Sequence, residues 1–304
     1  ETDLDDDQKM YAETISSSGS ALLTIINDIL NFSKIEAGKI ELDIAPFDLE
    51  EVMEDIVTLL STKAREKSVE MTLRYSPQLP KIFEGDIGRL RQVITNIAGN
   101  AVKFTTAGYI SIDVSGELGP SSYDLKIDVK DTGVGIPQEK FDHIFKAFEQ
   151  VDSARNRKFE GTGLGLAIST RLMTLMGGRI SVISDEGTGS VFTLRIPLKS
   201  SVVVPVAKPS TDMELAGLRT LVVDDLELNR KILSERLASW EMDVVLASSG
   251  AEALLILNDV GAQFDLIIQD YQMPNMDGGV LAERIRKIDK FSETPLIILS
   301  SNEQ

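Results

Sequence analysis

Glycines stand at alternate positions in the segment RKFEGTGLGLAIS, residues 157–169, just before an amphipathic pattern that predicts a helix. A Walker phosphate loop would require Gly-Lys-Ser/Thr, whereas Gly165 is followed by Leu166 and Ala167. A dinucleotide-binding fingerprint would require an apolar strand before the loop and a glycine or alanine where Ile168 stands. The remaining interpretation is a glycine loop at a helix N-terminus, where free backbone N–H groups suit an anion. From these residues alone, phosphate binding and an ordinary helix start are equally good explanations.

Carboxylates stand at the ends of apolar segments in the last third of the chain. Asp224 and Asp225 follow TLVV, Asp270 ends LIIQD, and Ser300 follows LIIL. Residues just past the carboxyl ends of neighbouring parallel strands meet in one crevice. Three carboxylates gathered there would repel one another unless a hard cation such as Mg²⁺ lay among them, and the cation would let one aspartate accept a phosphoryl group. Each acid taken singly is better explained as a solvated turn residue, so this prediction depends on the whole set.

A third group of polar side chains lies in the middle of the chain. Asn96, Asn100 and Lys103 are spaced by four and then three residues, so a helix would place them on one face. An Asn oxygen can bind Mg²⁺ and a lysine can bind phosphate. Asp131, in the motif DTGVGI, can accept a hydrogen bond from an adenine amino group, which would favour adenine over guanine. Asn96 considered alone is better explained as a polar surface residue.

The first element that we expect is a helix over residues 1–36. Apolar or small residues recur every three or four positions along it, at Ile15, Ser18, Leu22, Ile25, Ile29 and Phe32. Ile26 and Leu30 widen this stripe beyond a two-helix seam, which favours a bundle of about four helices. The helix therefore needs partner helices.

The remaining patterns predict two α/β domains joined by a linker. Residues 37–199 combine alternating strands, such as YISIDVS and DLKIDVKD, with amphipathic helices, which predicts an α/β sandwich. These helices are expected around residues 48–66, 88–103 and 163–176. Residues 200–216 contain prolines and small polar residues without a regular period, which indicates a linker. In residues 217–304 apolar strands alternate with helices, which predicts a parallel sheet.

Composition limits the classes of function. The chain has 304 residues, enough for roughly two domains, and a formal charge of −17. This charge argues against binding a nucleic-acid polymer or an anionic membrane. Without cysteine there are no disulfides, thiol nucleophiles or thiolate metal sites, which fits a cytoplasmic protein. No apolar run approaches the roughly 20 residues that cross a bilayer.

Five motifs occur in order around the glycine loop: RLRQVITNIAGNAVKFT, DVKDTGVGIP, FDHIFKAFEQVDS, GTGLGLAIS and DEGTGSVFTLRIP. Together they resemble the ATP-binding domain of sensor histidine kinases, within the GHKL group that includes Hsp90, gyrase and MutL. The resemblance implies that Asn100 binds the Mg²⁺ of ATP and that Lys103 and the glycine loop bind phosphate. The ATP-binding residues that it implies are Asn96, Asn100, Lys103, Asp131, Gly133, Gly135, Arg157, Gly161, Thr162, Gly163, Leu164 and Gly165. Glu160 departs from the pattern, because relatives usually carry glycine there.

Three further motifs, VVDD, DYQMPNMDG and PLIILSS, resemble those of response-regulator receiver domains, which have a flavodoxin-like parallel α/β fold. The resemblance implies that Asp270 is the phosphoacceptor, that Asp224, Asp225 and Asp270 bind Mg²⁺, and that the Ser300 hydroxyl responds to phosphorylation. Receivers finish with a strand that bears a lysine and a final helix, and neither follows Ser300. We therefore expect a receiver that is incomplete at its C-terminus.

The segment LLTIINDILNFSKIEAGKIEL resembles the second helix of the dimerising hairpin of histidine kinases, whose first helix carries the phosphorylated histidine. His143 is the single histidine, and we expect it on the surface near the nucleotide lid rather than as a phosphoacceptor. The first helix would then precede residue 1, and the chain would form a homodimer through the hairpin. Phe145 and Phe148 are expected to pack in the core below the lid.

We therefore predict the catalytic core of a hybrid sensor histidine kinase. ATP and Mg²⁺ would support phosphorylation of the upstream histidine, followed by transfer to Asp270 and then to a downstream receiver or phosphotransfer protein. Two alternatives remain. The chain could be a GHKL ATPase without a relay, or its receiver could be a regulatory pseudo-receiver that binds a small molecule such as a cyclic dinucleotide.

Overall fold

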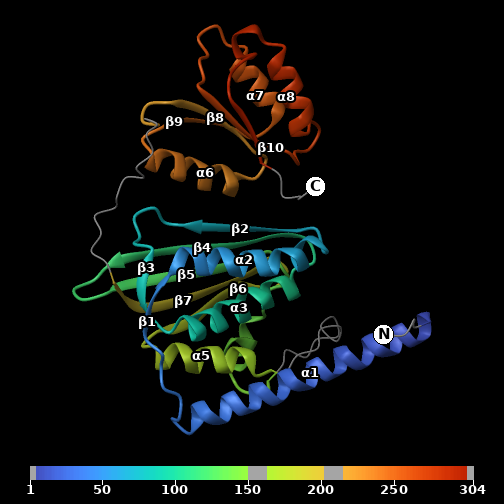
Figure 1. The fold of residues 1–304 in the computed structure, drawn as a ribbon, viewed down its shortest axis with the longest axis vertical. Helices are drawn as coiled ribbons and strands as arrows, with labels where there is room; N and C mark the ends of the chain where they lie inside the picture. Colours follow the sequence, from blue (N-terminus) through green and yellow to red (C-terminus); the bar gives the residue numbers. More distant parts are fainter. Residues whose placement is uncertain (1–4, 150–162, 202–214, 300–304) are drawn as a thin grey trace. The chain divides into compact units, whose positions relative to one another are not determined.

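The computed structural model describes residues 5–149, 163–201 and 215–299, which belong to two compact units (Figure 1). The first unit comprises Glu1–Val203 and the second comprises Val204–Gln304. Each unit has its own hydrophobic core. This division falls within residues 200–216, for which the sequence predicts a linker.

The first unit begins with the long helix α1, Asp6–Glu36. Its start is fixed by a capping box, because Asp5 accepts a hydrogen bond from the Gln8 N–H at 2.8 Å and the Gln8 side chain accepts one from the Asp5 N–H. The predicted helix is confirmed over its described residues. Large apolar side chains on α1 are exposed in the single chain, including Ile15, Leu22 and Ile29. The apolar stripe of α1 is therefore available to partner helices.

The rest of the first unit is built on a seven-stranded sheet with the order β1–β3–β7–β5–β4–β2, and β6 lies beside β7. Only β2 and β4 form a parallel pair among these neighbours. The strands are β1 (Ala45–Asp48), β2 (Val69–Tyr75), β3 (Ile82–Gly85), β4 (Gly108–Leu118), β5 (Tyr123–Asp131), β6 (Arg179–Asp185) and β7 (Gly189–Ser200).

Helices cover one face of this sheet (Figure 1). They are α2 (Leu49–Arg65), α3 (Ile87–Phe104) and α5 (Gly165–Leu175), with the short turns η1 (Gln138–Lys140) and α4 (Phe141–Ile144) before α5. Strands β4 and β5 alternate, so Ile110, Ile112, Ile127 and Val129 are fully buried in the core between sheet and helices. The predicted α/β sandwich is confirmed.

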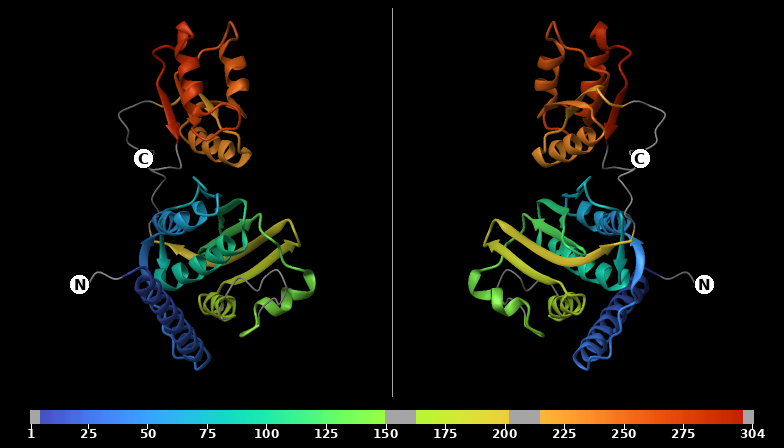
Figure 2. Two further views of the ribbon diagram at one scale, coloured as in Figure 1. Left: turned by 90° about the vertical axis from the view of Figure 1, so that its right-hand side faces the viewer. Right: turned by 90° about the vertical axis from the view of Figure 1, so that its left-hand side faces the viewer.

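The C-terminal end of α1 contacts α5 within the same unit (Figure 2). Phe32 and Ile35 pack against the core of the sandwich, and Arg171 on α5 pairs with Glu36 at 3.3 Å. Both partners of this ion pair are exposed, so packing rather than charge holds the end of α1 here.

The second unit contains a four-stranded parallel sheet with the order β11–β10–β8–β9. The strands are β8 (Arg219–Val223), β9 (Asp243–Ala247), β10 (Leu266–Asp270) and β11 (Leu296–Leu299). Helix α6 (Glu227–Ser239) packs on one face, while α7 (Gly250–Leu257) and α8 (Gly278–Arg286) pack on the other, and a turn η2 (Asp289–Phe291) precedes β11 (Figure 1). The predicted parallel sheet is confirmed. Across the described parts of both units, no helix combines the length and apolar character needed to cross a membrane.

Candidate nucleotide and phosphoryl-transfer sites

Helix α3 carries the predicted polar face. Asp86 begins the helix by accepting a hydrogen bond from the Arg89 N–H at 2.9 Å, and its other oxygen accepts one from the Asp43 N–H at 3.0 Å. Asn96, Asn100 and Lys103 all lie within α3 and are half-buried. The helical spacing read from the sequence therefore places the three side chains along one face, as predicted.

Asn96 joins α3 to α5. Its amide nitrogen donates a hydrogen bond to the Ser169 hydroxyl at 2.9 Å. A Cβ atom on Gly165 would lie 2.5 Å from the Asn96 Oδ1 atom, so only glycine allows this close approach at the start of α5. Asn96 is thus placed to hold α5 against α3, and its contact with the nucleotide stays a prediction.

Lys103 lies in the last turn of α3, with its Nζ atom 5.0 Å from the centre of the Phe104 ring. Burial lowers the pKa of the Lys103 ammonium because desolvation disfavours its charged form. An anion close to Lys103 would oppose this shift. The contact between Lys103 and phosphate stays a prediction.

Asp131 ends β5 and is only 6% exposed. Its Oδ1 atom accepts a hydrogen bond from the Gly133 N–H at 2.8 Å. Burial raises the pKa of the Asp131 carboxyl, while hydrogen bonds from the Gly133 N–H and from the N–H and hydroxyl of Ser190 act in the opposite direction. A buried carboxylate held by such donors is a fixed acceptor, as recognition of an adenine amino group requires.

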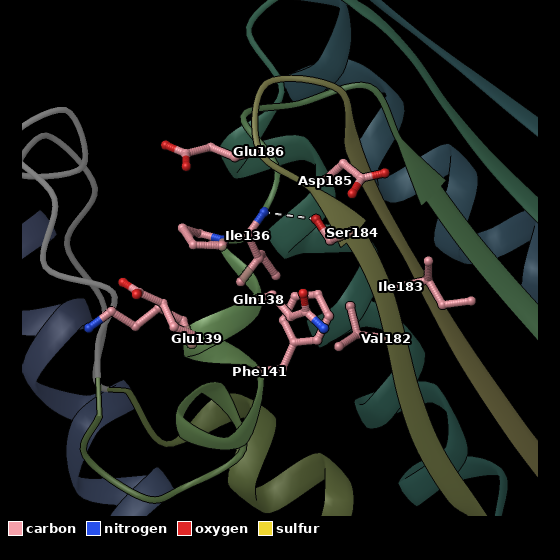
Figure 3. A pocket seen from close by; sticks show the side chains of 11 residues that line it. Ile136, Gln138, Glu139, Phe141, Val182, Ile183, Ser184, Asp185 and Glu186 are labelled. Atoms are coloured by element: carbon pink, nitrogen blue, oxygen red, sulfur yellow. Dashed lines mark hydrogen bonds between the residues drawn. The ribbon is translucent and has the colours of Figure 1, made fainter.

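The loop after Asp131 passes close to the turn between β6 and β7. Gly135 has a φ of +68°, and a Cβ atom on it would collide with the Asp185 carbonyl. The next residue, Ile136, donates its N–H to the Ser184 hydroxyl at 2.8 Å (Figure 3). Glycine at position 135 is therefore required by both backbone conformation and space.

A cavity of about 810 Å³ opens beside this contact, between residues 136–141 and 182–186 (Figure 3). Phe141 and Val182 supply apolar walls, and Glu139 and Glu186 supply acidic groups. None of the predicted nucleotide ligands on α3 lines this cavity, and neither does Asp131. This cavity is therefore separate from the site that the predicted nucleotide ligands would form.

The described end of the glycine loop leads directly into α5. Gly163 has a φ of +68°, and its carbonyl accepts a hydrogen bond from the Phe148 N–H at 3.2 Å. Leu164 is the N-cap of α5, and its own side chain makes no capping hydrogen bond to the first helical N–H groups. The predicted helix start is confirmed. Arg157, Gly161 and Thr162 lie outside the described residues.

In the second unit, Asp224 follows β8 and Asp270 ends β10, on strands that are parallel neighbours. Asp224 is 4% exposed, and burial raises its pKa to about 6, with smaller upward contributions from the nearby charges of Asp270 and Asp225. Burial also raises the pKa of Asp270, and the charge of Asp225 adds to the rise, while N–H groups of Gln272 and Tyr271 act against it. The structure thus brings the three acids within range of mutual repulsion, as predicted.

A hard cation among these carboxylates would relieve their repulsion, and their oxygen atoms are the ligands that Mg²⁺ prefers, so the residues fit that ion. As the side chains stand, no three His, Cys, Asp or Glu residues in the described chain are arranged to hold a metal ion. Ser300 lies outside the described residues. The Mg²⁺ role of the three acids therefore stays a prediction.

Several side chains that contact these sites were not predicted from the sequence. The Arg230 guanidinium donates to the backbone carbonyls of Asp224 at 2.7 Å and Asp225 at 2.9 Å, which fixes the loop that carries both acids. Asn229 hydrogen-bonds the Asp224 carboxyl. A basic residue on the first turn of the helix after an acid pair is the signal that could have indicated Arg230, whereas the contact between Ser190 and Asp131 depends on strand register alone.

The aromatic cluster near the lid differs partly from expectation. Phe145 packs against the core, as predicted. Phe148 is 64% exposed, and its ring meets the Phe32 ring of α1 edge-on at 6.3 Å between centroids, so the prediction of core packing for Phe148 is wrong. A φ of +66° turns Phe148 outwards. His143 is exposed and pairs with Glu149, which agrees with its predicted surface position.

Comparisons with known proteins match this architecture in chain order. Residues 1–38 match the His Kinase A (phospho-acceptor) domain, residues 85–200 match the histidine kinase-, DNA gyrase B- and HSP90-like ATPase, and residues 220–304 match the response regulator receiver domain. The fold and its sites thus define a histidine-kinase ATP-binding domain joined to a receiver.

Similar proteins share the same combination. The chain is 34% identical to the sensory/regulatory protein RpfC of Xanthomonas campestris over 99% of this chain and 46% of that protein. It is 36% identical to the aerobic respiration control sensor protein ArcB of Escherichia coli over 99% of this chain and 39% of that protein. It therefore spans less than half the length of these relatives. The crystal structure of full-length ShkA in complex with AMPPNP superposes with a TM-score of 0.75 at 29% identity, covering 98% of this chain and 63% of that one. The chain belongs to the hybrid sensor histidine kinases.

Proposed function

We propose that the chain is the catalytic core of a hybrid histidine kinase that phosphorylates a histidine on a preceding helix and passes the phosphoryl group to Asp270. The observation that carries this proposal is the buried Asp131 carboxylate, which lies beside the end of the helix that bears Asn100 and Lys103. One compact unit thus combines an acceptor suited to adenine with groups suited to Mg²⁺ and phosphate. The nucleotide analogue in the ShkA crystal is consistent with ATP as the substrate.

The first step would transfer the γ-phosphoryl group of ATP. Asp131 would orient adenine, Asn100 would hold the metal, and Lys103 together with the N–H groups at the start of α5 would bind phosphate oxygens. The bond between the γ-phosphorus and the bridging oxygen breaks, a bond to the imidazole nitrogen forms, and ADP leaves. Mg²⁺ would neutralise charge on the phosphates when bound.

The second step would move the phosphoryl group to the receiver. A carboxylate oxygen of Asp270 bonds to phosphorus as the phosphorus–nitrogen bond breaks, which regenerates the histidine. Asp224 and Asp225 are the acids that would hold Mg²⁺ there, and Arg230 fixes their loop. The hairpin dimer, the cytoplasmic location and a downstream receiver or phosphotransfer partner are parts of the same proposal. Regulation by a small molecule such as a cyclic dinucleotide stays a prediction.

Labelling of the full-length protein with γ-labelled ATP and Mg²⁺ tests the relay, because phosphohistidine is acid-labile and an acyl phosphate is alkali-labile. We expect Asp270→Asn to keep the acid-labile label and to lose the alkali-labile fraction. Asn100→Ala should abolish both, and undiminished labelling of that variant would contradict the proposed ATP metal site. An alkali-labile fraction that persists in Asp270→Asn would refute Asp270 as the acceptor, and the absence of that fraction from the wild type would favour a regulatory receiver.

A further inference from the structure

Lys67 binds the end of α3 from a different part of the sandwich. Its Nζ atom donates hydrogen bonds to the carbonyl of Val102 at 2.7 Å and to the carbonyl of Lys103 at 3.0 Å. Lys67 lies in the turn between α2 and β2, 36 positions before Lys103 in the sequence. The residue assigned to phosphate is thus held directly through its own backbone.

The last four carbonyls of a helix have no partner inside the helix and must be satisfied elsewhere. In α3, the Ala101 carbonyl accepts the Thr105 N–H at 3.0 Å, and the Phe104 carbonyl accepts the Val134 N–H at 3.4 Å. Lys67 donates to the two carbonyls between them, those of Val102 and Lys103. Its ammonium also lies at the negative end of the helix dipole, where a cation is favoured.

The turn between α2 and β2 fixes the backbone position of Lys67. Its backbone N–H donates to the Ala64 carbonyl at 3.0 Å, and its side chain is half-buried. Lys63, one turn earlier on α2, is exposed. The two lysines therefore provide a matched pair, of which Lys67 makes the contacts with α3.

We infer that Lys67 is a positioning residue, which fixes the last turn of α3 so that the Lys103 side chain is directed to the nucleotide phosphates. This inference rests on the proposed role of Lys103. A loss of both hydrogen bonds would let the last turn unwind, because its carbonyls would turn to water. The Lys103 side chain would then sample a wider range of conformations, and phosphate binding would weaken.

A double-mutant cycle on the full-length protein separates this role from a general loss of structure. The affinity for ADP with Mg²⁺ is measured by calorimetry for Lys67→Met, Lys103→Met and the double variant. We expect Lys67→Met to raise Kd roughly tenfold when Lys103 is present and by less than about twofold in the Lys103→Met background. Lys67→Arg should restore most of the affinity because it keeps the donors, and Lys63→Met should leave Kd unchanged.

The possible outcomes are distinct. Equal losses from Lys67→Met in both backgrounds would mean that it damages the domain as a whole, which overturns the role of Lys67 and leaves that of Lys103 intact. An unchanged Kd for Lys103→Met would instead overturn the proposed phosphate contact, and the role of Lys67 with it. If Lys67→Met does not fold, the same cycle with Lys67→Gln, which keeps one neutral donor, gives the decision.

Discussion

Replacing Asp131 by asparagine tests nucleotide recognition with a minimal change of shape. Asp131 is 6% exposed, and its Oδ1 atom accepts the Gly133 N–H, which an asparagine oxygen can still accept. The amide nitrogen, however, would stand where a carboxylate oxygen stood, and it cannot accept a hydrogen bond from the adenine amino group. A hydrogen bond to a charged group contributes about 1.5–3 kcal/mol, so Kd for ADP should rise roughly 10- to 150-fold.

The same variant should change base preference. Guanine presents a carbonyl oxygen where adenine presents an amino group, and an asparagine amide can donate to that oxygen. The ratio of the GDP and ADP dissociation constants should therefore fall. Asp128→Asn, on the same strand but half-buried and bonded to Thr193 at 2.7 Å, is the matched control and should not change Kd. A Kd within twofold of the wild type, with unchanged base preference in Asp131→Asn, would refute the role of Asp131.

The raised pKa of Asp131 adds a dependence on pH whose sign follows from linkage. Because the folded state raises the pKa of Asp131 through burial, the folded protein binds this proton more readily than the unfolded chain does. Asp131 therefore contributes more stability as pH falls through its raised pKa. The free energy of unfolding of the wild type, minus that of Asp131→Asn, should increase in that direction, while ADP binding to the wild type weakens because the charged acceptor is lost. Urea titrations and calorimetry over a pH series measure both, and a difference independent of pH would contradict the burial argument.

Two further predictions concern backbone geometry and the receiver. Gly135→Ala should destabilise the first unit by about 1–3 kcal/mol more than Gly187→Ala does. Both glycines have a positive φ, but only Gly135 faces a backbone carbonyl. Denaturant titration measures the two losses of unfolding free energy, and equal losses would mean that φ alone accounts for the effect. Arg230→Ala should weaken Mg²⁺ binding to the receiver roughly tenfold or more because the acid loop loses both guanidinium contacts, whereas Lys231→Ala, at an exposed neighbour, should not. Calorimetric titration with Mg²⁺ measures both affinities, and equal affinities in the two variants would exclude the positioning role of Arg230.

The regular elements could be predicted because local patterns determine them. The periods of α1, α2 and α3 and the apolar runs of β8 and β10 follow from burial of one face or of both, and each appears in the structure near its predicted bounds. Strands β1, β2, β3 and β6 were not predicted. They are short or at the margin of the sheet, and β6 alternates only between half-buried and exposed residues, so its hydrophobic signal is weak.

The functional side chains also divide into those that local sequence patterns place and those that only long-range packing places. Spacing within one helix was enough to place Asn100 beside Lys103, and strand ends were enough to place Asp224 near Asp270. Contacts that depend on how distant segments pack could not be predicted, such as Asn96 with Ser169. The outward turn of Phe148 follows from its positive φ, which no sequence period reports.

The end of α3 explains why these distant contacts matter together. Its Lys103 carbonyl is bound by Lys67, and its Phe104 carbonyl meets the Val134 N–H of the loop that follows Asp131. The groups assigned to phosphate and to adenine are thus attached to the same helix end. A change that removes Lys67 from this end should therefore weaken recognition of the phosphates through Lys103, whereas a change confined to Asp131 should affect the base alone. Comparing the affinities of adenosine and ADP in Lys67→Met and Asp131→Asn would separate the two effects, since Lys67→Met should reduce the gain in affinity that the phosphates provide and Asp131→Asn should leave that gain unchanged.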